Sequence, residues 1–387
     1  MKVAFVGDFL NHGTLLQTAG TAFVLLLSQL EEISEIDVYC PYRNLTGETF
    51  DLPSKIKIIE TYAYHKPISL LKLRKINEKK YGKLIFDMMP TAFGYGNFSN
   101  LFGLLLPLYF TIMKGATNIR VIYHNSVFVN DINNLGYNSG FDRLRKFVVA
   151  TIEKIIFKKV KVFVLLRTYK SNLDKKIPNN RVSVLEVKHL EAIVTVFANK
   201  VESQNFIILD QINDVTVVLL HGTWGPQKNL KLGLRVLARL KVDGLNFKVI
   251  LSGGINRHFP EYEREFLEIV KSYEGLITKY YGAVSEKLIM ELFMGADIVL
   301  LPYNAPGGHS GVLEQSMFFE VPTVAMAFPE YKEQSKNSNN VILINTEQEL
   351  FGILSKLIRN GSKSSHKINL KQKMTEAKEN IRVLVAN

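Results

Sequence analysis

Short apolar runs alternate along this chain with longer stretches in which apolar residues recur every three or four positions. In the first 200 residues the runs predict strands at 2–7, 36–40, 83–88, 120–123 and 161–166. Residues 18–30, between the first two runs, predict a helix. A strand that ends in glycine, followed by a helix and a further strand, is typical of a parallel α/β sheet.

The same rhythm starts again after about residue 205. Strands are predicted at 215–220, 247–251, 277–281, 296–302 and 322–326, and helices at 230–240, 261–272, 285–294 and 311–320. Ser285 is the expected N-cap of the third of these helices. Each strand is followed by a loop of glycine, proline or polar residues, and ligands bind at that carboxyl edge in open parallel sheets. The sequence therefore predicts two α/β domains.

Composition agrees with a globular chain of two or three domains. The chain has 387 residues, of which 47% are hydrophobic and 22% charged, and this excludes disordered, collagen-like and coiled-coil proteins. The one cysteine, Cys40, excludes a disulfide framework and a cysteine-based zinc or iron–sulfur site. The best candidate for a membrane span, 101–113, is too short and contains glycine and proline. Polar residues interrupt the N-terminus, so we expect no signal peptide.

Positive charge is concentrated in the first half of the chain. The formal net charge is +12, and residues 1–200 hold 27 Lys and Arg against 16 Asp and Glu. Such a field attracts nucleic acid, anionic lipid headgroups or phosphorylated substrates. Segment 141–161 predicts an amphipathic helix whose apolar stripe packs on the core. For the basic segment 65–83, an ordinary surface and an interfacial or acceptor-binding surface both remain open.

Two loops carry the residues with the clearest chemistry. The first, 221–230, lies between a predicted strand and a predicted helix and contains Lys228. The backbone N–H groups at a helix start attract a phosphate, and the lysine ammonium adds a full positive charge. An ordinary polar loop with a solvated lysine is the alternative.

The second loop, 306–311, leads into the predicted helix at 311–320, and its glycines let a ligand approach the backbone closely. Ser310 and the first N–H groups of the helix, those of Gly311 and Val312, are suited to hold a diphosphate. Glu314 lies about one turn inside that helix, where a carboxylate can accept hydrogen bonds from two hydroxyls of a ribose. The alternative is that Glu314 only stabilises the positive end of the helix dipole.

Residues 215–326 resemble the donor-binding domain of GT-B glycosyltransferases, in particular the retaining family 4, or group 1, enzymes. In that family a Gly-Arg-x-x-Pro-x-Lys-Asn-Leu loop follows the first strand of the C-terminal domain, and a Glu-x7-Glu segment precedes Gly-x-Pro-Val. The matching residues here are Gly222, Pro226, Lys228, Asn229, Leu230, Glu314 and Pro322. The resemblance implies that Lys228 neutralises the donor diphosphate and that Glu314 binds the ribose of the nucleotide.

Three positions depart from the family pattern. Thr223 stands where the family has its arginine, Pro306 where it has the first glutamate, and Val321 where it has the glycine before Pro-Val. One phosphate-binding charge and one contact to the sugar or phosphate are therefore missing. We expect His309 to replace part of the lost charge.

In the N-terminal half the resemblance rests on two positions. Gly13 corresponds to a glycine-rich loop after the family's first strand. His124 follows the predicted strand 120–123 and corresponds to a histidine that faces the transferred sugar. A structural hydrogen-bonding role for His124 is the alternative.

The resemblance implies a GT-B fold, in which two Rossmann-like domains with parallel sheets face a central cleft. We expect an N-terminal acceptor-binding domain at 1–200 and a C-terminal nucleotide-sugar-binding domain at 201–362. Residues 363–387 predict a terminal helix, which we expect to pack back on the N-terminal domain because it shares that domain's basic character.

The resemblance implies a hexosyltransferase that moves a sugar from a nucleotide-diphosphate donor to an acceptor, with retention of configuration. The positive charge of the N-terminal half suits a glycan or polyprenyl-phosphate-linked acceptor. Charge that develops on the departing diphosphate must be stabilised by a metal ion or by protein groups. Because the sequence has no Asp-x-Asp triplet, we predict metal-independent transfer that uses Lys228, Ser310 and the helix start at Gly311. Because donor sugars are cytosolic and the first half is basic, we predict a cytoplasmic enzyme, peripheral on the inner face of the cell membrane. We expect no nucleic-acid partner, because the sequence has no recognisable nucleic-acid-binding motif.

Three other interpretations remain. The departures at Thr223 and Pro306 also fit a nucleotide-sugar-binding partner subunit without transfer activity. A dinucleotide-dependent Rossmann enzyme is disfavoured because the first loop lacks Gly-x-Gly-x-x-Gly. A nucleic-acid-binding protein is supported by basic charge alone.

Overall fold

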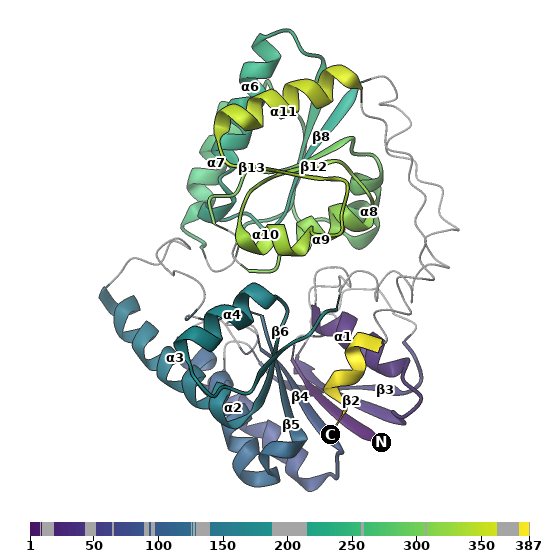
Figure 1. The fold of residues 1–387 in the computed structure, drawn as a ribbon, viewed down its shortest axis with the longest axis vertical. Coiled ribbons are helices and arrows are strands. Elements are labelled where there is room, and N and C mark those ends of the chain that lie inside the picture. Colours follow the sequence, from purple (N-terminus) through teal and green to yellow (C-terminus); the bar gives the residue numbers. More distant parts are fainter. Residues whose placement is uncertain are drawn as a thin grey trace. The chain divides into compact units, whose positions relative to one another are not determined.

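The structure is a computed structural model, and it describes residues 1–7, 9, 19–42, 52–63, 66–88, 93, 97–124, 126, 128, 140–187, 215–256, 259–305, 308–361 and 379–386. These residues fall into two compact units. Unit 1 holds the described residues up to 187 together with 379–386, and unit 2 holds those from 215 to 361. Each unit is built on one parallel sheet with helices packed against it (Figure 1).

Seven parallel strands form the sheet of unit 1, in the order β3-β2-β1-β4-β5-β6-β7. The strands are β1 (Lys2–Val6), β2 (Glu35–Pro41), β3 (Ile56–Tyr62), β4 (Lys83–Met88), β5 (Ile119–Tyr123), β6 (Lys161–Val164) and β7 (Val182–Val184). The helices are α1 (Ala19–Ser28), α2 (Asn97–Lys114), α3 (Gly140–Lys159) and α4 (Arg167–Lys176), with the 3₁₀ helices η2 (Pro67–Glu78), η3 (Ala116–Asn118) and η6 (Arg382–Leu384). The central strands are short and apolar because both faces of the sheet are covered.

Six parallel strands form the sheet of unit 2, in the order β10-β9-β8-β11-β12-β13. The strands are β8 (Thr216–His221), β9 (Phe247–Ser252), β10 (Ile277–Tyr281), β11 (Ile298–Leu301), β12 (Thr323–Met326) and β13 (Val341–Ile344). The helices are η5 (Pro226–Lys228), α6 (Leu230–Val242), α7 (Tyr262–Ser272), α8 (Glu286–Met294), α9 (Gly311–Phe318), α10 (Pro329–Gln334) and α11 (Glu347–Asn360). Ser285 caps α8 as predicted, since its side chain accepts from the Leu288 N–H.

Both strand orders are those of a doubly wound sheet, in which the connections run in opposite directions from the first strand. The reversal lies between β1 and β4 in unit 1 and between β8 and β11 in unit 2. Ligands bind at the carboxyl ends of the strands beside such a reversal. The predicted α/β fold with two Rossmann-like domains is confirmed.

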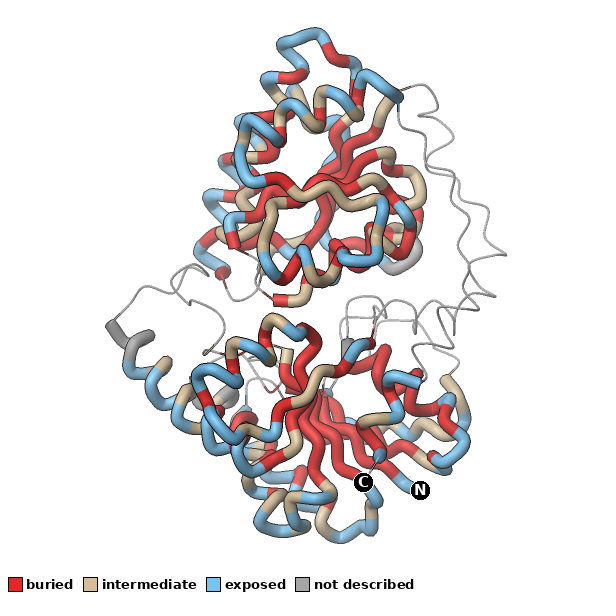
Figure 2. The backbone as a smooth tube through the Cα atoms, in the orientation of Figure 1, coloured by how far each residue is buried: buried red, intermediate tan, exposed pale blue. Residues whose placement is uncertain are grey.

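Burial follows the position of a strand in its sheet (Figure 2). β4, β5 and β11 are buried along their whole length. The edge strands β3 and β10 are only partly buried. The sheet centres are therefore continuous apolar cores, and the polar residues available for chemistry lie in the loops that follow the strands.

The C-terminal residues contact unit 1. The buried Arg120 guanidinium donates to the carbonyl of Ala386 (2.8 Å) and to that of Thr117 (2.7 Å). Arg382 forms an ion pair with Glu32 (3.2 Å). The described chain end is thus held against the N-terminal sheet; most of the predicted terminal helix lies outside the described residues.

The structure corrects one expectation for the helix at 141–161, which forms as α3. Its apolar stripe does not pack wholly on the core. Ile156 is buried, but Leu144, Phe147, Val148 and Ile155 are exposed. The helix has more apolar residues than the side facing the sheet can cover. None of the helices in the described part of the chain is long and apolar enough to cross a membrane.

Candidate functional site

The candidate site lies at the carboxyl edge of the unit 2 sheet, where β8 and β11 are neighbours. After β8 the chain passes through Gly222 and η5 into α6, and after β11 it leads to Ser310 at the start of α9. The N–H of Asn304 donates to the carbonyl of Gln227 (3.0 Å). This bond holds the segment that follows β11, just before the second predicted loop, beside the first loop.

Tight packing of the strand ends fixes the first loop. Nδ1 of His221, at the end of β8, lies 2.7 Å from Oγ of Ser252, at the end of β9. Gly253 follows with φ +104°, and a Cβ there would lie 1.8 Å from the carbonyl oxygen of Gly222. Burial, with a smaller effect of Lys228, lowers the pKa of His221 to about 3. His221 is therefore neutral and positions the loop.

Lys228 presents its amine in this loop with a phenol as its partner. Nζ donates to the hydroxyl of Tyr303 (2.7 Å) and lies 4.0 Å from the centre of that ring. Burial lowers the pKa of Lys228 to about 7, and no carboxylate among the described residues offsets that burial. Burial also raises the pKa of Tyr303, so the phenol stays protonated. A desolvated amine without a counter-charge is stabilised by a bound anion.

The start of α9 forms the other side of the site. Oγ of Ser310 accepts from the N–H of Leu313 (3.2 Å). Gln334 accepts from the N–H of Ser310 (3.1 Å) and donates to its carbonyl (2.8 Å). Among the described residues, the N–H groups of Gly311 and Val312 have no acceptor. Two N–H groups that no described residue accepts from, at a helix start that Ser310 caps, suit an anion.

Glu314 lies in the first turn of α9 and is only 4% exposed. Its Oε2 lies 3.7 Å from Nδ1 of His309, which comes from the loop before the helix. A protonated His309 would therefore share its charge with Glu314 as well as with a bound phosphate.

Gly222 joins the two halves of the site. It has φ +145°, and a Cβ at this position would lie 3.2 Å from Nζ of Lys228 and 3.4 Å from Cγ2 of Val312. The lysine amine and the first turn of α9 therefore border the same space beside Gly222. Any other residue would place its side chain in that space.

The structure thus brings together seven of the predicted residues: Gly222, Lys228, His309, Ser310, Gly311, Val312 and Glu314. Thr223, in the arginine position, is exposed. Gly13 and Pro306 lie outside the described residues. Sequence reasoning missed Tyr303 and Gln334. Tyr303 directly follows the predicted strand 296–302, so its place at the carboxyl edge was the available signal.

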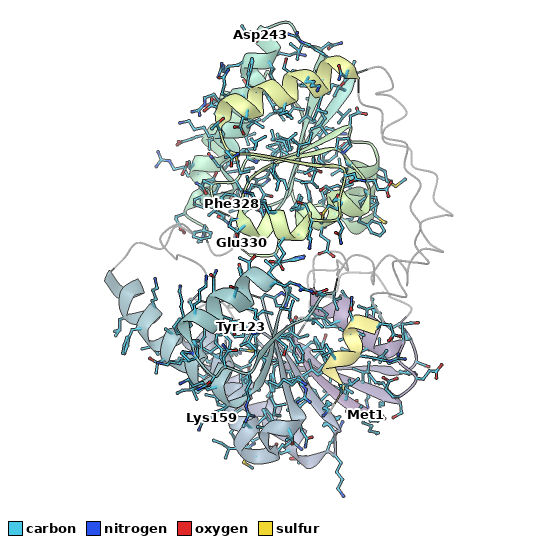
Figure 3. All side chains as sticks on the ribbon, in the orientation of Figure 1. Met1, Tyr123, Lys159, Asp243, Phe328 and Glu330 are labelled. Atoms are coloured by element: carbon cyan, nitrogen blue, oxygen red, sulfur yellow. The ribbon has the colours of Figure 1, made fainter. Side chains whose placement is uncertain are left out.

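His124 lies in unit 1, directly after β5. Its Nε2 is 2.6 Å from Oδ1 of Asp87, in the neighbouring β4. Tyr123 (2.6 Å), directly before His124, and Ser126 (2.7 Å), two residues after it, both donate to the buried carboxylate of Glu153. Tyr123 lies in the interior of unit 1 (Figure 3). His124 is therefore held at the carboxyl edge of its own sheet against β4, one of the two strands at the reversal.

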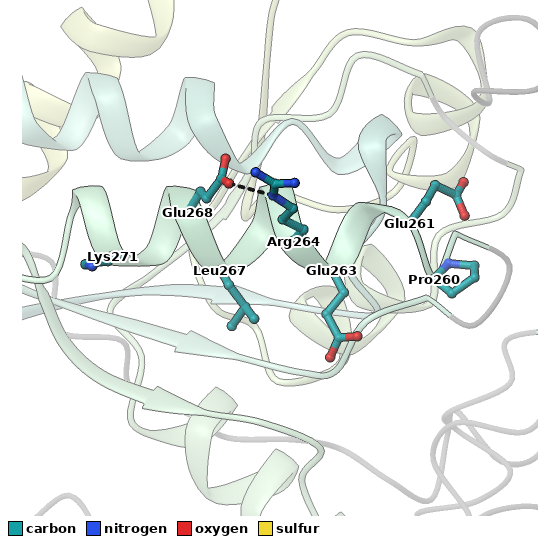
Figure 4. A pocket seen from close by; sticks show the side chains of 7 residues that line it. All are labelled: Pro260, Glu261, Glu263, Arg264, Leu267, Glu268 and Lys271. Carbon is teal, nitrogen blue, oxygen red and sulfur yellow. Dashed lines mark hydrogen bonds and ion pairs between the residues drawn. The ribbon is translucent and has the colours of Figure 1, made fainter.

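Two other features of the described residues bear on ligands. They include no cluster of three or more His, Cys, Asp or Glu side chains that could hold a metal ion. A hollow of about 520 Å³ runs along the exposed side of α7, where Arg264 and Glu268 form an ion pair (3.0 Å; Figure 4). Its lining is charged helix surface, and it includes no residue of the site at β8 and β11.

Residues 203–380 match the family model described as glycosyl transferases group 1. This part of the chain is a group 1 glycosyltransferase domain. The predicted resemblance and the predicted enzyme class are confirmed at this level. No curated protein sequence matches the chain.

Solved structures with the same fold cover nearly the whole chain. Sucrose-phosphate synthase from Thermosynechococcus elongatus is 12% identical with a TM-score of 0.66, and the match covers 100% of this chain and 95% of that one. HepE from Anabaena, in complex with UDP and glucose, is 15% identical with a TM-score of 0.60 over 100% and 94% of the two chains. WaaG, a glycosyltransferase involved in lipopolysaccharide biosynthesis, is 13% identical with a TM-score of 0.59 over 99% and 95%. The GT-B architecture therefore extends beyond the glycosyltransferase domain to the full chain.

Proposed function

We propose that this chain transfers a sugar, a hexose, from a nucleoside-diphosphate donor to an acceptor hydroxyl, without a metal ion and with retention of configuration. The observation that carries the proposal is the space beside Gly222, bordered by the amine of Lys228 and by the first turn of α9. A diphosphate there would meet one positive charge and the N–H groups of Gly311 and Val312, which have no acceptor in the part of the chain that the structure describes. Glu314, one turn further, would accept the ribose hydroxyls.

In the proposed reaction the bond between the sugar's anomeric carbon and the diphosphate oxygen breaks, and the acceptor oxygen attacks from the same face. The acceptor proton passes to the departing diphosphate oxygen. Lys228 and the helix start stabilise the negative charge that develops on that oxygen, the role that preorganised donors have in such transfers. His124, held by Asp87, would face the transferred sugar.

UDP-sugars are the first donors to consider, because HepE, with the same fold, is solved with UDP-glucose. For the acceptor we propose a glycan or a polyprenyl-phosphate-linked glycan, supported by the excess of Lys and Arg in residues 1–200. WaaG acts in lipopolysaccharide biosynthesis, and a similar place in polysaccharide assembly fits such an acceptor. The enzyme would then work in the cytoplasm, peripheral to the inner face of the membrane.

Isothermal titration with UDP tests the donor site, since UDP carries the diphosphate and the ribose. Lys228→Ala and Glu314→Ala should each weaken binding by about tenfold to a hundredfold, the loss of a hydrogen bond to a charged group. Lys231→Ala, on an exposed residue at the start of α6, is the matched control and should bind as the wild type does. Failure of the wild type to bind UDP, GDP or ADP would overturn the proposal.

A partner subunit that binds the nucleotide sugar without transferring it is the second candidate. The observation that favours it is Thr223, an exposed neutral residue where the family has a charged one. Incubation with UDP-glucose, and with the other nucleotide sugars that bind, distinguishes the two. Release of UDP or a transferred sugar, lost in Lys228→Ala, supports the enzyme. Binding without either, with every donor and acceptor tested, supports the subunit.

A further inference from the structure

Exposed apolar side chains gather on one part of unit 1. Eleven of the sixteen exposed large hydrophobic side chains among the described residues lie on η2, α2 and α3. They are Ile68, Leu71, Phe102, Leu105, Tyr109, Ile112, Met113, Leu144, Phe147, Val148 and Ile155. In unit 2 the exposed members are Val242, Leu267 and Tyr280, each on a different element. Scattered apolar residues are normal on a protein surface, but a gathered set marks an interaction site.

The three elements form one continuous face. Nδ2 of Asn77 in η2 donates to the hydroxyl of Tyr109 in α2 (3.1 Å). The Lys114 amine at the end of α2 donates to the carbonyl of Lys79, directly after η2 (3.0 Å). On its other side α2 contacts α3, and the two helices run next to each other in Figure 1. We refer to this surface as the η2–α2–α3 face.

α2 is apolar on two sides. Its inner side packs on the core: Leu104 and Phe110 are buried, and a Cβ at Gly103 would lie 2.5 Å from the Phe93 ring. The exposed residues Phe102, Leu105, Tyr109, Ile112 and Met113 recur every three or four positions and share the outer side. Ile112 is 83% exposed. A helix that is apolar all round is normally covered on all sides, so the outer side of α2 calls for an apolar partner.

Basic side chains flank this stripe on both neighbouring elements. η2 and its ends carry the exposed Lys66, Lys72, Arg74, Lys75, Lys79 and Lys80, and α3 carries the exposed Lys154, Lys158 and Lys159. The exposed acidic residue of η2 is Glu78, and α2 has no acidic residue. α3 contains two acidic residues, Asp142 near its start and Glu153, which is buried. An apolar stripe between two basic margins matches the layers of an anionic bilayer, with acyl chains below negative headgroups.

We propose that the η2–α2–α3 face binds the surface of an anionic lipid bilayer, with the outer side of α2 entering the headgroup region. A second copy of the chain fits less well, because a symmetric contact would place the basic margins against each other. The inference deepens the proposed function in that it names the surface that would bring the enzyme to a lipid-linked acceptor. Its test needs no donor and no transfer.

Vesicle flotation with the full chain tests the proposal. Vesicles of phosphatidylcholine alone and vesicles that also contain phosphatidylglycerol are compared at low and high salt. The wild type should float with the anionic vesicles, and less so at high salt. Lys72→Glu combined with Lys75→Glu should weaken this binding by about tenfold or more. Ile112→Ser combined with Met113→Ser should abolish the binding that survives at high salt.

Matched changes in unit 2 provide the controls. Lys271→Glu with Lys336→Glu reverses the same charge, and Val242→Ser alters a side chain that is 88% exposed; both should bind vesicles as the wild type does. UDP titration without lipid shows that every variant is folded and tests the donor site separately. The proposal is overturned if the wild type binds neither vesicle or if the controls lose as much binding as the face variants. Concentration-dependent dimers that Ile112→Ser abolishes would assign the face to a second copy instead.

Discussion

The pH dependence of nucleotide binding follows from the environment of Lys228. In the free protein, burial lowers the pKa of this amine to about 7. A diphosphate beside it would raise that pKa, because an opposite charge favours the protonated form. The complex then holds the proton more tightly than the free protein does. Affinity is therefore full below pH 7 and falls as the pH rises toward the higher pKa of the bound state.

The size of the effect can be worked from the same pKa. Above pH 7 the free amine is largely neutral and must take up a proton to pair with the diphosphate. With a free-state pKa of about 7 and a bound-state pKa restored to the ordinary lysine value of about 10.4, the affinity for UDP falls about fiftyfold from pH 7 to pH 9, or about 2.3 kcal/mol. Binding should take up about half a proton at pH 7 and about 0.9 at pH 8.

Titration calorimetry with UDP, in buffers of different ionisation enthalpy, measures both quantities. Lys228→Arg should give a flat profile over this range because a guanidinium does not lose its proton. Tyr303→Phe removes the hydroxyl 2.7 Å from Nζ but keeps the ring, so the fall in affinity should begin at lower pH. A flat profile for the wild type, or an unchanged slope in Lys228→Ala, would refute the reasoning.

Three further outcomes follow from the contacts described above. Gly253→Ala should cost about 2–5 kcal/mol of stability because the new Cβ would overlap the Gly222 carbonyl at a strained φ. Unfolding monitored by the fluorescence of the single tryptophan, Trp224, measures this loss of stability. Gly275→Ala is the control: its new Cβ would have no atom nearby, so it should change stability by less than about 0.5 kcal/mol. In titrations, the wild type should bind 2′-deoxy-UDP at least about tenfold more weakly than UDP, whereas Glu314→Ala should bind the two nucleotides with equal affinity. A variant that still prefers UDP would contradict the proposed ribose role of Glu314. Truncation after residue 378 should destabilise unit 1 by about 1–3 kcal/mol in circular-dichroism unfolding, since Arg120 loses the Ala386 carbonyl as an acceptor. The same truncation should cost less stability in the Arg120→Met variant, which has no guanidinium to leave unpaired.

The sequence predicts the central strands and the helices between them because their apolar periods are set by burial on both faces. It misses β3, β7 and β13, all at sheet edges. β3 is partly exposed and β7 has three residues, so neither shows the continuous apolar run of a central strand. The stripe of α3 misleads for a related reason. Periodicity shows that apolar residues share one side of a helix, but not whether the protein itself covers that side.

The candidate site depends on the order of the strands as well as on the sequence motifs. Motif spacing places Lys228 in a loop and Glu314 in the first turn of a helix, but the environment of the lysine amine includes Tyr303, which lies 75 residues further along the chain. The two meet because β11 pairs with β8 across the strand reversal, although β9 and β10 lie between them in sequence. The same pairing sets the first turn of α9 beside Gly222. A chain with the same loops on strands in a different order would keep the motif and lose the lowered pKa, so the strand order is as much a part of the anion site as the lysine itself.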